Sequence, residues 1–463
     1  MVFSTQSFLF FFLPLFLGIY FLLPAGSCNR LRNYWLLAGS LVFYGWYEWK
    51  LLPLLPVITF VCWFAGKYMA EGGKYRKSAV AAASAISIFT LISCKILAVG
   101  GETDSLPEWM GEFVFPLGIS FYTFQALSYT FDVYSGRNMQ YNHTGYFSFL
   151  TGTSMFTQLA AGPVVRWHSL APQISGRKYL PEKFSRGSLL FMAGFAKKIL
   201  LADELGMIAD EVFYASSPGT FASWLGITAY TLQIYFDFSG YCDMGIGAAM
   251  MTGFILPQNF RSPLRSCSIR EFWHRWHITL SKWFRDYIYI PMGGNKKGIF
   301  RTSCNILTVM LLSGIWHGAG WNFIIFGLLH GAAMVLERMK RYLFPGLKLP
   351  AITGWLWMIS VVLVSFVFFR TGTPSAALEY LGTMTGLRGG IAADGLVLNN
   401  ILSYKNLLLM ASGIFIAVCT RTTAASAARR GNSFWICLMI IFFAASIIKM
   451  LSVPGENFIY FIF

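Results

Sequence analysis

Long uncharged, apolar stretches alternate with short polar stretches along this chain of 463 residues. Residues 351–369 and 433–448 carry no charged side chain, and residues 8–24 and 78–94 show the same pattern. A helix that crosses a bilayer needs about 20 consecutive, mostly apolar residues. The pattern therefore predicts an all-α polytopic integral membrane protein. We expect roughly 11 transmembrane helices plus re-entrant helices, from the number and length of these stretches.

Two neighbouring apolar stretches, 113–131 and 146–162, cannot both be complete crossings. An acidic stretch precedes them at 102–112, and a basic stretch follows at 166–186. Basic stretches tend to stay in the cytoplasm, so the chain should change sides only once between these two points. One of the apolar stretches should therefore be broken or re-entrant. Residues that break helices lie within or directly beside them: Pro116, Gly118, Gly162 and Pro163.

Composition and charge support a membrane protein and argue against a nucleic-acid-binding protein. Hydrophobic residues make up 56% of the chain and charged residues 12%, whereas soluble domains carry about 25% charged residues. The net charge of +16 does not indicate nucleic acid, because the basic clusters alternate with the apolar stretches as the positive-inside rule requires. We expect the basic stretch 261–301 in the cytoplasm, and the acidic loops 102–112 and 203–211 and both chain ends outside.

The polar stretches are too short for a core of their own, so residues 1–463 should form a single transmembrane domain.

His317 lies in a stretch without charges, 302–336, beside a glycine-rich turn. An imidazole at membrane depth is costly and usually functional, although a core histidine bonded to a carbonyl is the alternative. Residues 303–316 would form a helix of only about 21 Å, shorter than the roughly 30 Å hydrocarbon layer. We therefore expect His317 at the base of a pit. Trp316 and Asn322, its neighbours, are candidate substrate-binding residues.

His317 suits the role of general base, taking the proton of an attacking hydroxyl. No nucleophilic serine motif such as G-x-S-x-G is present, which favours direct transfer over an acyl-enzyme.

A basic, aromatic-rich stretch that precedes His317 in the sequence carries two more histidines, His274 and His277. Arg275, Lys282 and Arg285 in this stretch would attract a phosphate-bearing donor to a cytoplasmic mouth. The alternative is an interfacial belt of aromatic and basic residues. If the stretch is helical, the two histidines share one face of the helix, but a metal site needs a third and usually a fourth ligand. We predict no metal.

Other polar residues in apolar surroundings have structural explanations. Asp237 and Asp243 should pair internally with Arg or His rather than take part in catalysis. Lys197 and Lys198 suit helix ends from which their charges reach water. His330 should be a packing residue.

Several motifs together resemble one known family. These are FPLGISFYTFQALSYTFDVYSG at 115–136, AGPVVRW at 161–167, YFDFSGYCDMGIG at 235–247, EFWHRWHITLSKWFRDYIYIPMGGN at 271–295 and GIWHGAGWNFIIFGLLHG at 314–331. In this order they resemble the membrane-bound O-acyltransferases (MBOATs), in particular the branch that contains alginate O-acetyltransferases. The resemblance covers essentially the whole chain. One departure is His274, where that branch usually has arginine.

The resemblance implies an MBOAT fold around a central tunnel in the bacterial inner membrane. It implies His317 as the catalytic base and His277 as a second functional histidine. The donor would be acetyl-CoA from the cytoplasm, used as a substrate with no bound cofactor. The acceptor would be an exported polysaccharide such as alginate, reached through a periplasmic SGNH-type acetyltransferase partner.

Within the family, the alternatives are acetylation of peptidoglycan or cellulose, or D-alanyl export to teichoic acid. A transporter or channel is the alternative from another class, but it should show paired broken helices in two halves.

Overall fold

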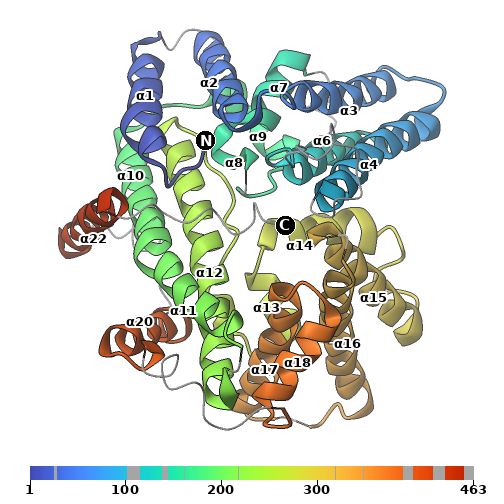
Figure 1. Cartoon of the computed structure of the whole chain (residues 1–463). Coiled ribbons are helices and arrows are strands. Elements are labelled where there is room, and N and C mark those ends of the chain that lie inside the picture. The colour runs from blue at the N-terminus through green and yellow to red at the C-terminus, as the bar shows by residue number, and fades with distance from the viewer. Residues whose placement is uncertain are drawn as a thin grey trace. The chain divides into compact units, whose positions relative to one another are not determined.

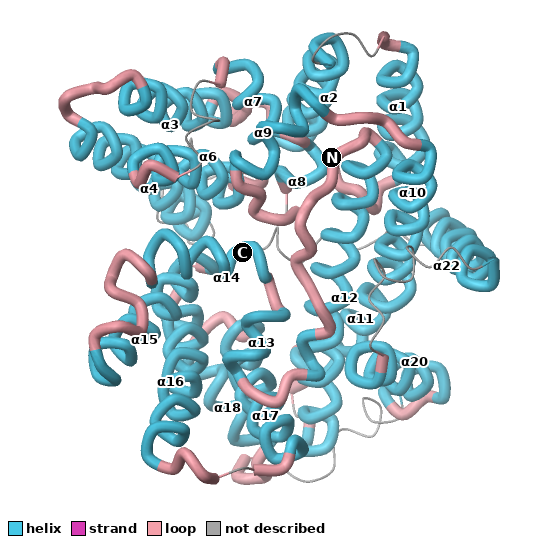
Figure 2. The backbone as a smooth tube through the Cα atoms, turned by 180° about the vertical axis from the view of Figure 1, so that it is seen from behind, coloured by secondary structure: helices cyan, strands magenta, loops and turns pink. Residues whose placement is uncertain are grey.

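The computed structural model describes residues 1–24, 29–101, 115–137, 144–160, 162–216, 218–318, 320–347, 349–388, 400–420 and 433–452. Within these ranges the chain forms helices and loops but no strand (Figures 1 and 2). The prediction of an all-α protein is confirmed. The predicted periplasmic C-terminus, at residue 463, lies outside the described residues.

The helices are α1 (Leu13–Leu22), α2 (Arg30–Glu48), α3 (Leu54–Ala70), α4 (Arg76–Gly101), α6 (Ile119–Tyr134), α7 (Tyr146–Ser154), α8 (Phe156–Leu159), α9 (Trp167–Gly176), α10 (Pro181–Ala196), α11 (Asp203–Phe213), α12 (Gly219–Met251), α13 (Ile269–Arg275), α14 (Ile278–Phe284), α15 (Gly298–His317), α16 (Trp321–Leu343), α17 (Ala351–Arg370), α18 (Pro374–Met384), α20 (Tyr404–Ile414) and α22 (Ser433–Ser452). Short irregular helices extend or link them: η1 (Ser7–Phe12), η4 (Lys197–Ala202), η5 (Pro263–Arg265), η6 (Arg285–Tyr289) and η7 (Phe415–Cys419).

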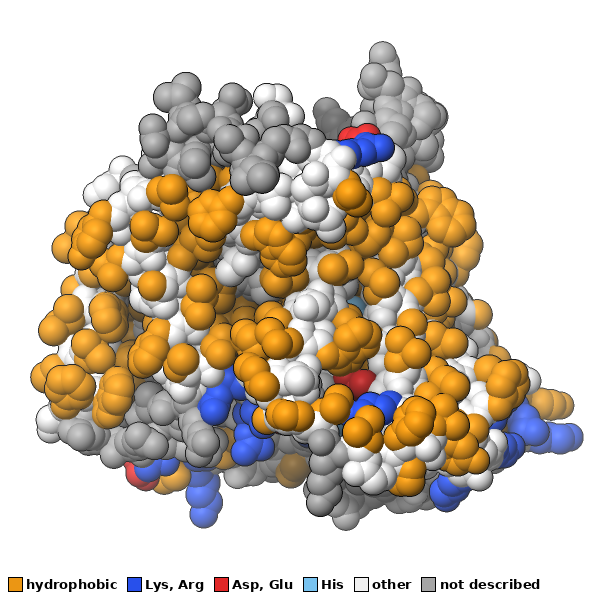
Figure 3. All heavy atoms as spheres, turned by 90° about the horizontal axis from the view of Figure 1, so that it is seen from below, with side chains coloured by type: hydrophobic (Ala, Val, Ile, Leu, Met, Phe, Trp, Pro, Cys, Tyr) orange, Lys and Arg blue, Asp and Glu red, His pale blue; other side chains and the backbone are white. Residues whose placement is uncertain are grey.

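Five helices in the described part of the chain are long and apolar enough to cross a membrane: α4 over Arg76–Ala98, α15, α16, α17 and α22. Three apolar helical segments are shorter: Ser7–Leu22, Leu54–Ala70 and Tyr404–Cys419. Large apolar side chains are exposed on these helices, and hydrophobic groups cover much of the surface seen in Figure 3. Such surfaces suit lipid. The chain is a multi-pass membrane protein, and the count of about 11 spans stays a prediction.

The chain forms two compact units: Met1–Met192 with Tyr241–Gln258, and Ala193–Gly240 with Asn259–Phe463. Unit 1 is built on buried aromatic side chains. The rings of Phe3 and Phe8 lie 4.9 Å apart, and those of Phe43 and Phe156 lie 5.7 Å apart. These contacts hold the first helices against the segment around α8.

The expected break occurs in the apolar stretch 146–162. Its helix stops after nine residues, Met155 leaves the helical conformation with φ −50° and ψ 120°, and the four-residue helix α8 follows. At 1.5 Å per residue neither piece can cross a bilayer. The neighbouring helix α6 starts after Gly118, whose φ is +67° and whose added Cβ would lie 1.9 Å from the carbonyl oxygen of Leu159. Glycine therefore lets the two backbones touch.

In unit 2, α16 packs between α15 and α17, as both ribbon views show (Figures 1 and 2). The pair α15–α16 is held very close by glycine. A Cβ on Gly314 would lie 2.2 Å from the carbonyl oxygen of Phe323, and one on Gly327 would lie 2.3 Å from that of Met310. Small residues allow such close helix contacts in membrane proteins.

The acidic stretch 203–211, which the sequence suggested is a loop, forms most of helix α11. Its carboxylates hold other elements of unit 2. Glu204 binds Lys405 and Lys449, each at 2.6 Å, and Asp210 pairs with Arg370. Opposite charges within the fold therefore explain why these acidic residues cluster.

Candidate functional site

Helix α13 carries the Phe-Trp-His-Arg motif and is fixed firmly at its start. Ser268 caps it by accepting a hydrogen bond from the backbone N–H of Glu271 at 3.0 Å. Glu337 of α16 accepts from the backbone N–H groups of Ile269 and Arg270, at 2.6 and 3.3 Å. A carboxylate at a helix N-terminus is stabilising. This contact ties α13 to the helix that follows His317.

His330 adds a second link among the same helices. The indole N–H of Trp273 on α13 donates to His330 Nδ1 at 3.3 Å, and His330 Nε2 lies 2.9 Å from Ser365 Oγ on α17. Because an indole can only donate, Nδ1 accepts and Nε2–H donates to the serine. His330 is packed among aromatic rings as expected, but it also joins three helices through hydrogen bonds.

The chain leaves α13 through an unusual turn. Trp276 is extended, and His277 has a left-handed backbone with φ +42°. Such a conformation is uncommon for a residue other than glycine and often marks a functional site. A backbone hydrogen bond of 2.9 Å from Ile278 N–H to the carbonyl oxygen of Asn259 holds the turn in place.

Asn259 also sets the protonation of the buried His277 ring. Its side-chain oxygen accepts from Thr279 N–H at 3.1 Å, from Thr279 Oγ1 at 2.9 Å and from His277 Nδ1 at 3.2 Å. The backbone N–H of Thr279 can only donate, so the atom facing it is the amide oxygen. His277 Nδ1 must then carry the proton. In the neutral imidazole the lone pair belongs to Nε2.

His277 lies outside the five candidate spans, and its side chain is completely buried. Burial lowers the pKa of His277 to about 3, because an apolar environment disfavours the imidazolium. The ring is therefore neutral at physiological pH, with Nε2 able to accept a proton or a hydrogen bond.

His317 is the last residue of α15 and is 4% exposed. Its ring packs against Trp316, Phe326 and Phe369, with centroid distances of 4.7, 5.6 and 5.3 Å. The predicted burial is confirmed. However, α15 has 20 residues and begins at Gly298, so the expected half-length helix is wrong. At about 30 Å its length gives no reason for His317 to lie at the base of a pit.

The structure brings His277, Trp316 and His317 together. The Trp316 ring lies 5.8 Å from the His277 ring and 4.7 Å from the His317 ring. One indole therefore contacts both imidazoles. Two buried imidazoles in contact with one indole form an arrangement suited to proton transfer.

His274 is not part of this arrangement. It is exposed on α13, and its Nδ1 lies 2.7 Å from the carbonyl oxygen of Arg270. Because α13 ends at Arg275, the stretch is not one continuous helix, and His274 and His277 do not share a helical face.

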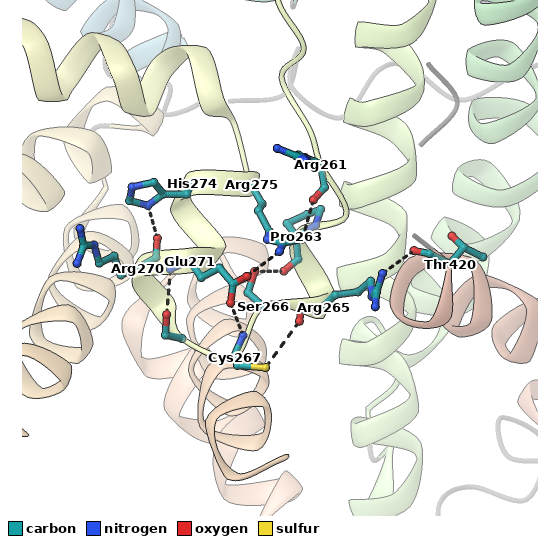
Figure 4. Close-up of polar contacts among 11 residues, drawn as sticks. Arg261, Pro263, Arg265, Ser266, Cys267, Arg270, Glu271, His274, Arg275 and Thr420 are labelled. Atoms are coloured by element: carbon teal, nitrogen blue, oxygen red, sulfur yellow. Dashed lines mark hydrogen bonds and ion pairs between the residues drawn. The ribbon is translucent and has the colours of Figure 1, made fainter. Parts of the chain in front are cut away.

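The predicted basic residues of the mouth have acidic neighbours. Arg275 pairs with Glu271 at 2.7 Å (Figure 4), and Arg285 pairs with Asp286 at 2.6 Å. Lys282 is exposed. The stretch 261–301 still carries nine Lys and Arg against two acidic residues, so it keeps a strong positive potential. A role in donor binding stays a prediction.

The remaining predicted polar residues are divided between the units. Asp237 lies 3.0 Å from Lys198, which also binds Asp203 at 2.7 Å. Asp237 is thus paired internally, with lysine instead of the expected Arg or His. The charge of Lys198 does not reach water as expected, because Lys198 is 2% exposed. Asp243 is half-buried in unit 1. Asn322 donates to the carbonyl oxygen of Thr371 and joins α16 to α17.

Sequence reasoning missed Asn259 and gave His330 too small a role. Asn259 lies 18 positions before His277, and no spacing rule connects the two. A signal was present, because Asn259 is a carboxamide directly beside the Phe260–Arg261 pair that opens the basic stretch. For His330, the signal was its position on the helix after His317.

Comparison with known proteins shows what this chain is similar to. The model of MBOAT, the membrane-bound O-acyltransferase family, matches residues 44–373, a range that contains both His277 and His317. The probable alginate O-acetylase AlgI of Azotobacter vinelandii is 41% identical over 400 residues, covering 83% of this chain and 78% of that protein. The peptidoglycan O-acetyltransferase of Helicobacter pylori is 34% identical over 434 residues, covering 84% and 80%. The teichoic acid D-alanyltransferase of Streptococcus thermophilus is 26% identical over 340 residues, covering 70% and 79%.

Proposed function

The chain belongs to the membrane-bound O-acyltransferase family, and we propose that this O-acyltransferase moves acetyl groups from acetyl-CoA in the cytoplasm to an exported polysaccharide such as alginate. The 41% identity to a probable alginate O-acetylase supports acetyl as the acyl group and alginate as the polymer. The bacterial inner membrane is the matching location. A periplasmic SGNH-type acetyltransferase would complete the transfer to the polymer.

The observation that carries the proposed chemistry is the contact of both imidazoles with Trp316. His317 takes the proton of the acceptor hydroxyl while the hydroxyl oxygen forms a bond to the carbonyl carbon of the thioester. The carbon–sulfur bond then breaks, and the proton passes to the leaving thiolate. His277, held by Asn259 with Nε2 as its acceptor, would orient a reacting group by a hydrogen bond.

The charge of the stretch 261–301 and the burial of the two histidines describe how the donor would be bound. The stretch 261–301, with its excess of Lys and Arg, would attract the phosphates of acetyl-CoA from the cytoplasm. The charged donor avoids entering hydrocarbon if only its acetyl group reaches the buried histidines.

Two other acceptors follow from the relatives of lower identity. These are peptidoglycan, from the Helicobacter pylori protein, and teichoic acid with D-alanine as the acyl group, from the Streptococcus thermophilus protein. Acyl incorporation tested with each polymer in membranes that contain this chain distinguishes among them. Movement of a substrate without any acyl transfer would instead indicate a transporter or channel.

The central test is His317→Ala in membranes supplied with labelled acetyl-CoA. Acetyl transfer should be abolished while the amount of inserted protein stays unchanged, because no base remains for the attacking hydroxyl. More than a few per cent of wild-type transfer at normal abundance would remove His317 as the base.

A second experiment tests transfer across the bilayer. In sealed proteoliposomes of known orientation, acetyl-CoA on the side of the stretch 261–301 should acetylate an acceptor on the opposite side. If donor and acceptor must share one compartment, the enzyme acts on one side only and the relay is refuted.

A further inference from the structure

A pair of buried glutamines in unit 1 is not explained by the proposed chemistry. Gln125 lies on α6 and Gln158 on α8, with 2% and 0% of their side chains exposed. Gln158 Nε2 donates to Gln125 Oε1 at 3.2 Å and to the carbonyl oxygen of Gly152 at 2.7 Å. Buried amides are costly unless all their hydrogen-bonding groups have partners, so the remaining atoms of the pair matter.

The break between α7 and α8 creates this arrangement. In an uninterrupted helix the carbonyl of Gly152 would accept from the N–H of Phe156, but that N–H donates to Ser40 Oγ at 3.0 Å. The carbonyl is thereby available to Gln158. Broken helices at membrane depth often form binding sites in membrane proteins.

The two amides are oriented without ambiguity. A carbonyl oxygen only accepts, so the atom of Gln158 that faces Gly152 is its NH₂ group. Both N–H bonds of Gln158 are then used. Among the described residues, Gln158 Oε1 has no donor and Gln125 Nε2 has no acceptor. The hydroxyls of Thr123 and Thr157, in the same two segments, are also buried without partners in the described structure.

We infer that the Gln125–Gln158 pair binds a neutral group that offers one hydrogen-bond acceptor and one donor. The acceptor of that group faces Gln125 Nε2, and its donor faces Gln158 Oε1. A secondary amide has this pattern, and so does a hydroxyl. The inference rests on the proposed acetyl transfer, in which the pantetheine arm of coenzyme A brings two such amides and a polysaccharide acceptor brings hydroxyls.

The test measures equilibrium binding to the purified full-length protein. The probes are coenzyme A, pantetheine, adenosine 3′,5′-bisphosphate (the nucleotide part without the amides) and an alginate oligosaccharide. Gln125→Leu and Gln158→Leu keep the approximate volume and remove the hydrogen-bonding groups. Gln173→Leu is the matched control, because its amide already has partners in Ser169 and Ile255 of the same unit.

Each of the two variants should bind pantetheine and coenzyme A about tenfold more weakly, the effect of one or two lost hydrogen bonds. Binding of the bisphosphate should stay unchanged. Each substitution also leaves the other amide without its hydrogen bond, so affinities are measured on protein shown to be folded by thermal unfolding. Gln173→Leu should bind every probe like the wild type. A loss confined to the oligosaccharide would keep the site and assign it to the acceptor hydroxyl.

Equal affinities of wild type and variants for every probe would overturn the inference and leave internal water as the partner of the pair. A wild type that binds neither pantetheine nor oligosaccharide would overturn it as well. The proposed function fails by a different result, the absence of acetyl transfer by the wild type.

Discussion

Asn259 offers the sharpest test of how the site works, because it is placed to act on the site through its hydrogen bond with His277. We expect Asn259→Ala to lower acetyl transfer about 10- to 100-fold, as loss of the partner that orients a functional histidine does elsewhere. In the wild type, its side-chain oxygen accepts three hydrogen bonds, at 2.9, 3.1 and 3.2 Å. Without it, His277 can take the other tautomer or rotate, and Nε2 no longer presents its lone pair.

The same substitution should also reduce stability. It leaves His277 Nδ1–H and two donors of Thr279 without their acceptor in a buried place, and each such group costs about 1–3 kcal/mol. Partial relaxation of the turn would reduce the sum, so a loss of about 2–4 kcal/mol is a reasonable expectation. Activity must therefore be normalised to folded protein, measured by size-exclusion chromatography and thermal unfolding in detergent.

Asn259→Asp separates orientation from packing. The carboxylate keeps the shape and accepts the same hydrogen bonds, but its charge favours the imidazolium and raises the pKa of His277 from its value of about 3. Transfer that needs neutral His277 should then fall as the pH drops through the raised pKa and recover at higher pH. The wild type should show no loss from His277 between pH 5 and 8.

The matched control is Asn305→Ala. Asn305 is a buried asparagine of the same unit that donates to the carbonyl of Gly294 at 2.9 Å. Its loss should destabilise the protein without moving the pH profile. If Asn259→Ala keeps most of its activity, or if Asn259→Asp has the wild-type pH profile, then Asn259 does not orient His277.

Three further predictions concern other parts of unit 2. His277→Ala should lower transfer about 10²- to 10⁴-fold, the usual contribution of an acid–base group, and a chelator should leave wild-type transfer unchanged; stoichiometric metal lost together with activity would contradict this. Lys198→Met should destabilise the protein by about 3–5 kcal/mol because it leaves two buried carboxylates without their cation, and adding Asp237→Asn should restore part of the loss in thermal unfolding. A reporter that works only in the cytoplasm should be active when it is fused within the stretch 261–301. Activity there of a reporter that works only in the periplasm would reverse the proposed orientation.

The sequence was sufficient for the parts of the molecule that depend on local pattern. The fold class follows from the apolar stretches, and the burial of His317 follows from its setting in a stretch without charges. The roles of His277 and His317 stay predictions. The break in 146–162 was predictable because charge on either side required one incomplete crossing. The break lies at Met155, whose backbone leaves the helical conformation although methionine is not a helix-breaking residue type.

Features that depend on tertiary contacts could not be predicted in this way. The partnership of Asn259 and His277 requires a left-handed turn, which brings together residues that are distant in the sequence. Helix α15 begins before Arg301 although that charge suggested a boundary. A long arginine can extend from a helix end toward water, so it does not have to end the helix.

A cluster of charged residues indicates the side of the membrane only if ion pairs within the fold do not already explain the cluster. The carboxylates of Glu204 and Asp210 attract basic residues of α17, α20 and α22, so their position in the sequence says little about the side of the membrane. The stretch 261–301 is different, because its nine basic residues exceed its two acidic ones whatever pairs they form. Its net positive charge should hold it in the cytoplasm. The same charge would attract an anionic donor, so the side of this stretch and the side of donor supply should prove to be the same.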